Sequence, residues 1–362
     1  MAYGTVNKSQ TIVTPNIYTG TGSEPRALTG FGHQTDLLWV FRRDSTMHPT
    51  INDSVQGATQ WIYSDLDQGA DTSTQAITYG TDGITWNGGN YDRNDNGANY
   101  LALSWKAGTT TGISAGSQTI TPASYSINVD AGFGIYKYTG NGSSTQTISH
   151  GLGAAPTFMM IKRINGGNSY WAVYHKNSGA DKRLTLNTTA ASATNANTWQ
   201  DTDPTSTVFT IGSNSRVNEN GQEYIAYVWA NKNGSFHAGQ YRGNGDSADG
   251  PFVYTGFKPG IILFKDNNAT TNWTIRNVAT DTFNYIRNYN FPNTNTAGTD
   301  IGPPATSGGE TSTICATGFK LRGTNDAYWN QSSQTYVYAA WPIENLVGGT
   351  NNIPNVAGLT SN

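Results

Sequence analysis

Three similar stretches of this sequence decide its fold: NYLALSWKAG (99–108), EYIAYVWANKNG (223–234) and TYVYAAWPIEN (335–345). Each is an apolar run that ends on a tryptophan, and Trp105, Trp229 and Trp341 align. A polar turn precedes each run, written DRNDNGA, RVNENGQ or WNQSSQ, which is typical of hairpins. Because self-similarity in a fixed order is the signature of repeat proteins, we expect each run to be the closing strand of one of three diverged copies.

Two earlier elements recur ahead of each closing strand. The opening one is a glycine turn, found in NIYTGTGS (16–23), YKYTGNGSS (136–144) and GQYRGNGDS (239–247). The second is a turn followed by an apolar strand, found in GFGHQTDLLWVFRRD (30–44), GLGAAPTFMMIKRIN (151–165) and TGFKPGIILFKDNN (255–268). The runs LLWVF, FMMI and IILF are too continuous for a one-sided strand, so they predict central strands covered on both faces.

A further element alternates apolar and polar residues. It is weak at Ile51–Val55 and clear in SYWAVYHKNSG (169–179) and TNWTIRNVATD (271–281). In these stretches Trp171 with Val173, and Trp273 with Ile275, occupy equivalent positions. Such alternation predicts strands with one face in the core and one in solvent.

These elements predict an all-β protein of three tandem β-sandwich units, jelly-roll or lectin-like, of about a hundred residues each. The expected units cover residues 1–112, 113–236 with a preceding linker, and 237–347. Linkers are expected at TTTGISAGSQTITPASYS (109–126) and NGSFHAG (233–239). Residues 348–362 carry no core pattern and are expected to be an extended tail that becomes ordered only against a neighbour.

Composition limits the possible functions. The 362 residues include 12% charged and 12% aromatic side chains, and the net charge is −3. No basic stripe is present, so nucleic-acid binding is not expected, and the densest basic pairs, Arg42–Arg43 and Lys182–Arg183, are expected at solvated strand ends. Cys315 has no disulfide partner and is expected to be a small apolar strand residue. No apolar run in MAYGTVNKSQ (1–10) or elsewhere predicts secretion or membrane insertion, so synthesis in a cytoplasm is expected.

The wording of the repeated elements resembles a known family. The matching stretches include residues 133–179, VNENGQEYIAYVWA (217–230), residues 239–266, residues 36–65 and NYLALSWKAGT (99–109). They resemble a repeat domain of virion structural and tail-fibre proteins that are widespread in marine tailed phages, including cyanophages, over residues 16–347. No catalytic residues come with that family. The resemblance implies a non-enzymatic structural protein of the phage particle.

We therefore expect a virion protein, assembled in the host cytoplasm, that decorates the capsid or belongs to a tail appendage. Its expected partners are other virion proteins and further copies of itself, because a surface protein without disulfides needs other stabilisation. No heptad shaft or collagen-like run is visible, which argues against a long fibre. The rival hypotheses are a receptor-binding module that recognises host surface glycans and a glycan-degrading enzyme.

Candidate chemistry is sparse, and no catalytic, cofactor-binding or metal-binding residue is predicted. The histidines His33, His48, His150, His175 and His237 lack metal spacing. His150 is expected at the surface, in the turn SHGLG, and His175 is expected to face solvent.

Residues 92–97 (DRNDNG) match half of a calcium loop, but Leu103 replaces the bidentate glutamate, so a polar turn is favoured and bound calcium stays an alternative. Asp65 and Asp67 are expected in a solvated loop rather than as a glycosidase pair. GTGS, GNGS and GNGD are not dinucleotide fingerprints, because no helix is expected after them.

Aromatic side chains in loop-like stretches are the best candidates for sugar or protein contacts. They are Trp61, Tyr63, Trp86, Tyr91, Trp199, Tyr285, Tyr289 and Trp329. For each one taken singly, a structural role at the end of a sandwich is favoured.

Overall fold

The structure is a computed structural model. The described residues are 12–73, 76–88, 91–113, 118–246, 248–281, 284, 286–299, 311–323 and 327–343; of residues 91, 92 and 311 only the backbone is described. Strands in antiparallel sheets dominate, and the helices of the described part are the four-residue turns α1 (Tyr91–Asn94), α2 (Ala196–Trp199) and α3 (Ser215–Asn218). The all-β, sandwich-like prediction is confirmed. The predicted tail at 348–362 lies outside the described residues.

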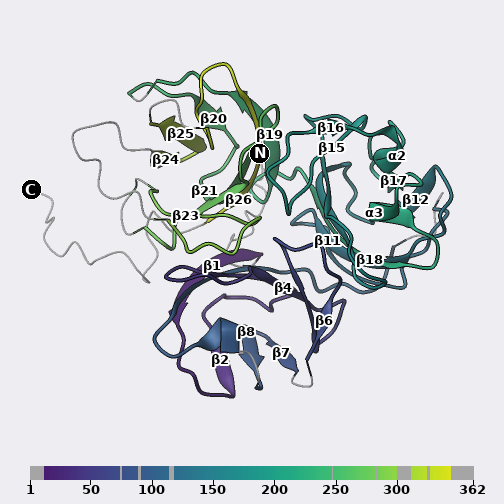
Figure 1. Cartoon of the computed structure of the whole chain (residues 1–362), viewed down its shortest axis with the longest axis horizontal. Coiled ribbons are helices and arrows are strands. Elements are labelled where there is room, and N and C mark those ends of the chain that lie inside the picture. The colour runs from purple at the N-terminus through teal and green to yellow at the C-terminus, as the bar shows by residue number, and fades with distance from the viewer. Residues whose placement is uncertain are drawn as a thin grey trace, which may run out of the picture.

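The strands form three lobes around a centre (Figure 1). Lobe 1 (residues 12–107) has a large sheet in the order β1-β9-β3-β4-β5-β6 and a small sheet in the order β2-β8-β7. Its strands are β1 (Val13–Thr19), β2 (Arg26–Thr29), β3 (Leu37–Arg42), β4 (Thr50–Asp53), β5 (Gln60–Tyr63), β6 (Asp71–Thr72), β7 (Ile77–Gly80), β8 (Gly83–Trp86) and β9 (Asn99–Trp105).

Lobe 2 (residues 118–230) has a large sheet in the order β10-β11-β18-β13-β14 and the two-stranded sheets β12-β17 and β15-β16. Its strands are β10 (Ser124–Asn128), β11 (Phe133–Thr139), β12 (Gln146–Ser149), β13 (Pro156–Arg163), β14 (Ala172–His175), β15 (Lys182–Arg183), β16 (Ala193–Thr194), β17 (Val208–Ile211) and β18 (Glu223–Ala230). The predicted linker 109–126 is therefore only partly a connection, because strand β10 begins within it.

Lobe 3 (residues 236–343) has a large sheet in the order β19-β26-β21-β22-β23 and a small sheet in the order β20-β25-β24. Its strands are β19 (His237–Arg242), β20 (Phe252–Tyr254), β21 (Pro259–Asp266), β22 (Thr274–Asn277), β23 (Tyr289–Asn290), β24 (Thr311–Cys315), β25 (Gly318–Arg322) and β26 (Thr335–Pro342). Cys315 ends β24 and is half-buried.

The three large sheets pack their inner faces into one shared core. In β3, Leu37, Trp39 and Phe41 belong to this core, whereas Leu38 and Val40 point the other way into a core of lobe 1 alone. The alternation of β13 and β21 has the same result, with separate outer cores in lobes 2 and 3. This arrangement explains why the runs LLWVF, FMMI and IILF are apolar at every position, as predicted.

The prediction for the alternating element is wrong in one respect. Every residue of β14 and β22 is buried, so neither face meets solvent. Trp171 and Val173 lie in the shared core, and Ala172 and Tyr174 lie in the outer core of lobe 2. The sequence alternates because the two cores differ, since the outer core accepts the small Ala172 and the phenol of Tyr174. The boundaries at 112 and 236 stay predictions.

Candidate functional site

The glycine turn of lobe 2 is held by an asparagine. The side chain of Asn218 accepts a hydrogen bond from the Asn141 amide (2.8 Å) and donates one to the Ser143 carbonyl (2.7 Å). The hydroxyl of Tyr138 donates to the Val217 carbonyl, one residue earlier (2.7 Å). These bonds tie the opening turn to the stretch before the closing strand, which the sequence places far away.

Glycine is required in this turn for two reasons. A Cβ on Gly140 would lie 2.5 Å from the Glu219 carbonyl oxygen, closer than real Cβ atoms approach. Gly142 has a φ of 72°, the left-handed region that favours glycine. We call the combination of tyrosine, two glycines and asparagine the clasp.

The same contacts occur in lobes 1 and 3. Asn94 accepts from the Thr21 amide and donates to the Ser23 carbonyl, and Asn330 accepts from the Asn244 amide and donates to the Asp246 carbonyl. A pair of stacked tyrosines accompanies each clasp, with ring centroids 5.0–5.2 Å apart: Tyr18 with Tyr100, Tyr138 with Tyr224, and Tyr241 with Tyr336.

The clasps bear on two chemical hypotheses. Asn94, a candidate calcium ligand, already uses both side-chain atoms in its turn, and Asp95 forms an ion pair with Arg42 (2.6 Å). Among the described residues, no three histidine, cysteine, aspartate or glutamate side chains gather as a metal ion would require. The glycine turns lead into β2, β12 and β20, so they offer no helix terminus to a phosphate. The sequence indicated that these stretches are polar turns, but it did not predict that their asparagines hold the glycine turns by hydrogen bonds.

The three closing tryptophans meet at the centre of the molecule. Trp105, Trp229 and Trp341 have ring centroids 5.4–6.2 Å apart and interplanar angles of 66–71° and 75°, which is edge-to-face packing. All three are buried. Each comes from a different lobe, so the contact joins the lobes into one body.

Further contacts cross from lobe to lobe around this centre. The indole N–H of Trp171 donates to the Tyr63 carbonyl of lobe 1 (3.0 Å), and that of Trp273 donates to the Thr185 carbonyl of lobe 2 (2.9 Å). The hydroxyl of Tyr227 in lobe 2 donates to Asp53 in lobe 1 (2.7 Å).

Buried lysines were not expected from the sequence. The ammonium of Lys162 donates to the carbonyls of Asp67 in lobe 1 and Ser169, and burial lowers its pKa to about 7. Lys265 donates to the carbonyls of Asp266 and Ala269, and burial lowers its pKa to about 8. Both lysines close backbone turns, and no sequence signal separates them from exposed lysines at strand ends.

The histidine predictions need correction. His150 is buried rather than at the surface, because its ring accepts from the Leu152 amide and contacts the Thr205 carbonyl (3.1 Å), both within lobe 2. His175 is also buried and contacts the Tyr338 carbonyl of lobe 3 (3.0 Å). Desolvation lowers the pKa of both imidazoles to about 4. Segments that are distant in the sequence contact both side chains, Thr205 of the same lobe for His150 and Tyr338 of lobe 3 for His175, and a local sequence pattern cannot reveal them.

Two polar pairs have the residue types of catalytic groups. His33 contacts the Ser104 hydroxyl (2.9 Å), but Ser104 is fully buried and Thr35 shares its hydroxyl (3.0 Å). His48 contacts Asp65 (2.6 Å), whose side chain is only 4% exposed. The expectation that Asp65 is solvated is therefore wrong, while the carbonyl of Asp67 holds Lys162.

Four of the eight candidate binding rings are buried. Trp86, Trp199, Trp329 and Tyr289 lie in the outer cores, as the favoured structural interpretation predicted. Trp61 and Tyr63 are half-buried, and the guanidinium of Arg93 lies 4.7 Å from the Trp61 ring centroid. Tyr285 and the side chain of Tyr91 lie outside the described part.

The basic pairs are less solvated than expected. Arg42 is held by Asp44 and Asp95, and Arg183 is half-buried with a hydrogen bond to the Thr198 hydroxyl (3.2 Å).

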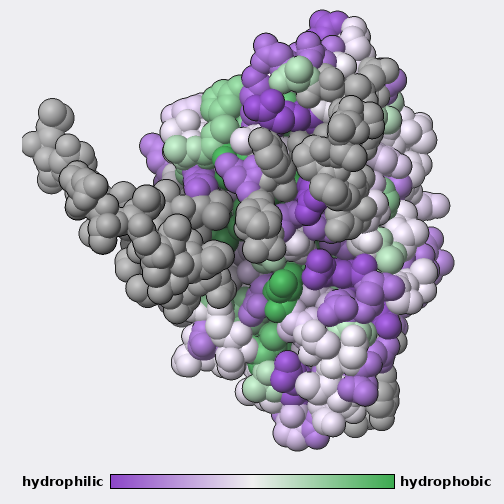
Figure 2. Space-filling model, turned by 90° about the vertical axis from the view of Figure 1, so that its left-hand side faces the viewer, coloured by the Kyte–Doolittle hydropathy of each residue, from purple (hydrophilic) through white to green (hydrophobic). Residues whose placement is uncertain are grey.

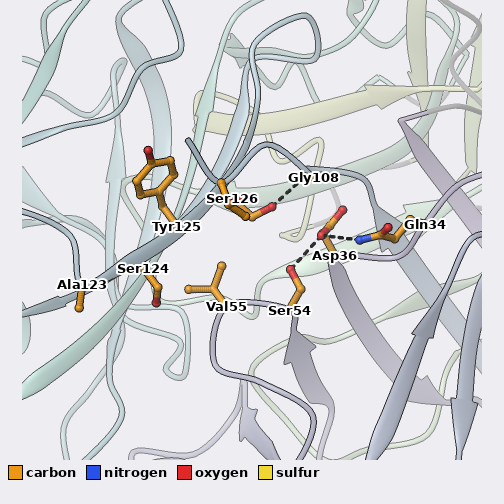
Figure 3. A pocket seen from close by; sticks show the side chains of 10 residues that line it. Gln34, Asp36, Ser54, Val55, Gly108, Ala123, Ser124, Tyr125 and Ser126 are labelled. Carbon is orange, nitrogen blue, oxygen red and sulfur yellow. Dashed lines mark hydrogen bonds between the residues drawn. The ribbon is translucent and has the colours of Figure 1, made fainter. Parts of the chain in front are cut away.

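An open hollow of about 400 Å³ lies between lobe 1 and the strand β10 (Figure 3). Asp36 points into it beside Gln34 and Ser54, and Ser126 lies opposite. The Asp36 carboxylate already accepts from Gln34 (3.3 Å), the Ser54 hydroxyl (2.8 Å) and the Ala107 amide (2.8 Å). Among the described residues that line the hollow there is no histidine, cysteine or lysine to pair with Asp36 in acid–base chemistry.

Residues 8–345 match the family model described as domain of unknown function DUF7483. The chain belongs to this family. The match extends from before β1 to just after β26 and so includes the clasps, the central tryptophans and the hollow. No curated protein and no solved structure matches the chain. The family description names no activity, so function has to be argued from the geometry.

Proposed function

We propose that this DUF7483 protein is a rigid, non-enzymatic structural subunit on the outside of a bacteriophage particle, built from three tandem copies of one β-sandwich unit. The observation that carries the proposal is the meeting of Trp105, Trp229 and Trp341 at the centre, one from each lobe. This contact and the clasp in each lobe make the body stiff, which favours a structural role over a reactive site.

The similar strand orders of the three lobes support both parts of the proposal. Each large sheet contains the opening strand, the closing strand and the continuous apolar strand as neighbours in that order: β1-β9-β3, β11-β18-β13 and β19-β26-β21. A body with three similar sides suits a position where three neighbouring subunits of an assembly meet, because each side can make a similar contact. Weak contacts repeated three times then add through effective concentration.

The surface also suits an exposed position on a particle. Only 12% of the residues are charged, so salt would screen little of its stabilisation. Figure 2 shows one face on which hydrophilic side chains dominate and apolar ones form small separate patches. The proposal that the particle is a bacteriophage rests on the resemblance of the repeated stretches to phage virion proteins. Within the described part no helix could cross a membrane.

The rival hypothesis of a glycan-binding module has less support. Four of the aromatic rings that it would use are in the cores: Trp86, Trp199, Tyr289 and Trp329. A ring that packs an outer core cannot stack on a sugar without local unfolding.

Purified particles of a phage that encodes this chain test the proposal. Mass spectrometry should find the chain in the particles, and antibodies against it should label intact particles from outside. Labelling along the shell or at the tail would choose between capsid decoration and a tail appendage. Detection in infected cells but never in purified particles would refute the proposal.

A further inference from the structure

The small sheet of lobe 3 ends in an unusual edge strand. β20 lies at one end of the order β20-β25-β24. Phe252 is 50% exposed and Tyr254 is 64% exposed, while Val253 between them is buried. An exposed edge with two large rings is a site where another strand can add.

The hydrogen-bond pattern shows which backbone groups face outward. Leu321 donates to the Pro251 carbonyl, and Thr255 donates to the Thr317 carbonyl, so residues 251, 253 and 255 bond to β25. In an antiparallel ladder the intervening residues point their N–H and C=O groups to the opposite side. Within the described part of the chain, no backbone group bonds to the N–H of Phe252 or Tyr254. The Tyr254 carbonyl accepts from the Tyr338 hydroxyl (3.2 Å), so the groups that an added strand would meet are the two N–H groups.

The corresponding edge in lobe 2 is covered by a segment of the chain itself. There β12 pairs with β17 as β20 pairs with β25, and Thr147 takes the place of Phe252. The Thr147 carbonyl accepts from the amides of Thr119 and Ile120, both at 3.0 Å, and Ile120 forms a parallel bridge with Ile148. This fold therefore accepts an added strand at this edge.

The corresponding strand of lobe 1 is different. Its edge strand β2 exposes the small side chains of Ala27 and Thr29 where β20 exposes Phe252 and Tyr254. An edge with small side chains leaves little apolar surface for a partner to cover. The rings of β20 make its edge the one that would gain most from a covering segment.

We propose that the edge of β20 is a docking site for the carboxyl-terminal segment of the same chain, residues 344–362. The last described residue, Ile343, donates its amide to the Lys258 carbonyl (3.1 Å). Lys258 is four residues after Tyr254, so the segment starts within about 14 Å of the end of β20. Residues 344–362 could extend about 60 Å, so reach is no obstacle.

The sequence of the segment suits strand addition. ENLVGGTNNIPNVAGLTSN carries one charge, on Glu344, and includes Leu346, Val347, Ile353 and Val356 among polar residues. Pro354 is compatible with an edge strand, which needs bonds on one side only. Attachment at Ile343 gives the segment a high effective concentration at β20, which favours the same chain over a second copy. This inference does not depend on the place of the protein on a particle.

Amide hydrogen exchange on the full chain and on a form that ends at Ile343 tests the proposal. The amides of Phe252 and Tyr254 should exchange at least about tenfold faster in the shortened form, because they lose their partners. The Thr119 and Ile120 amides, covered in lobe 2, and the Ala27 amide, exposed in lobe 1, serve as controls and should not change. Equal exchange of Phe252 and Tyr254 in the two forms would overturn the proposal.

A second variant tests the same contact by changing β20 and measuring protease cleavage of residues 344–362. In the full chain, Phe252→Lys with Tyr254→Lys should speed protease cleavage within residues 344–362, whereas Ala27→Lys with Thr29→Lys on β2 should not. Unchanged cleavage would overturn the proposal. Protection of Phe252 that vanishes on dilution, together with a dimer mass by light scattering, would assign the edge to a second copy and overturn docking within the chain.

Discussion

Replacement of Trp229 by alanine tests whether the three lobes form one cooperative body. Trp229 is 1% exposed and has five aromatic neighbours, with ring centroids at 4.9 Å (Phe133), 5.6 Å (Phe158 and Trp341) and 6.2 Å (Trp105 and Phe236). Removal of a buried tryptophan costs about 3–5 kcal/mol of the free energy of unfolding.

The matched control is Trp199→Ala. Trp199 is equally buried, but it lies in the outer core of lobe 2 and has one ring neighbour, Tyr174, at 5.7 Å. An aromatic pair adds about 0.5–1.5 kcal/mol beyond burial. Because the neighbours of Trp229 also pack on one another, their contributions overlap, and we expect Trp229→Ala to cost about 2 kcal/mol more than the control.

The location of the effect matters more than its size. Urea unfolding gives the free energies, and hydrogen exchange with mass spectrometry reads each lobe separately. Trp229→Ala should lower protection in β9 of lobe 1 and β26 of lobe 3 as well as in lobe 2. Trp199→Ala should lower it first in lobe 2. If Trp229→Ala changed protection in lobe 2 alone, the lobes would be independent domains and the argument from the shared core would be wrong.

Two further predictions concern the clasp and the buried lysine. Asn218→Ala should lower the free energy of unfolding in urea by about 1–3 kcal/mol, because it leaves the Asn141 amide and the Ser143 carbonyl without their partner; a cost below about 0.5 kcal/mol would contradict the structural role of the clasp. Burial lowers the pKa of Lys162 to about 7, whereas the unfolded chain keeps this proton to about pH 10.4, so the unfolded state binds more protons between these values. Through Lys162 the free energy of unfolding should therefore rise with pH from about 7 to 10, by up to about 1.4 kcal/mol per pH unit, and Lys265, whose pKa is lowered to about 8, should add a similar slope above pH 8. Lys162→Met should therefore remove the rise between pH 7 and 8 and about half of the rise above pH 8; an equal slope in both proteins would refute the prediction.

Much of the fold could be predicted because the residue types in a strand indicate whether one or both of its faces are buried. A run such as FMMI can be apolar at every position only where both faces of a strand are covered, and β13 lies between two other strands with every residue buried. The alignment of the three closing tryptophans was equally visible. Their meeting at one point was not, because an aligned sequence position does not specify a direction in space.

The candidate site was harder to predict, and the errors have one cause. His150, His175 and Asp65 were expected in solvent because their immediate neighbours are polar or turn-forming. Burial of His175 depends on lobe 3, whose contacting residue, Tyr338, is far away in the sequence. The clasp asparagines were seen as parts of polar turns, and only their hydrogen bonds to a distant glycine turn show their role.

The sequence by itself determined that this chain is an all-β protein, and it predicted that opening, apolar and closing strands recur in order, because side-chain periodicity and turn chemistry are local properties. The tertiary structure alone decided that Trp105, Trp229 and Trp341 touch, that Lys162 and His175 are buried, and that the edge of β20 is exposed. Those features depend on how the sheets face one another, and burial is a property of the whole packed body.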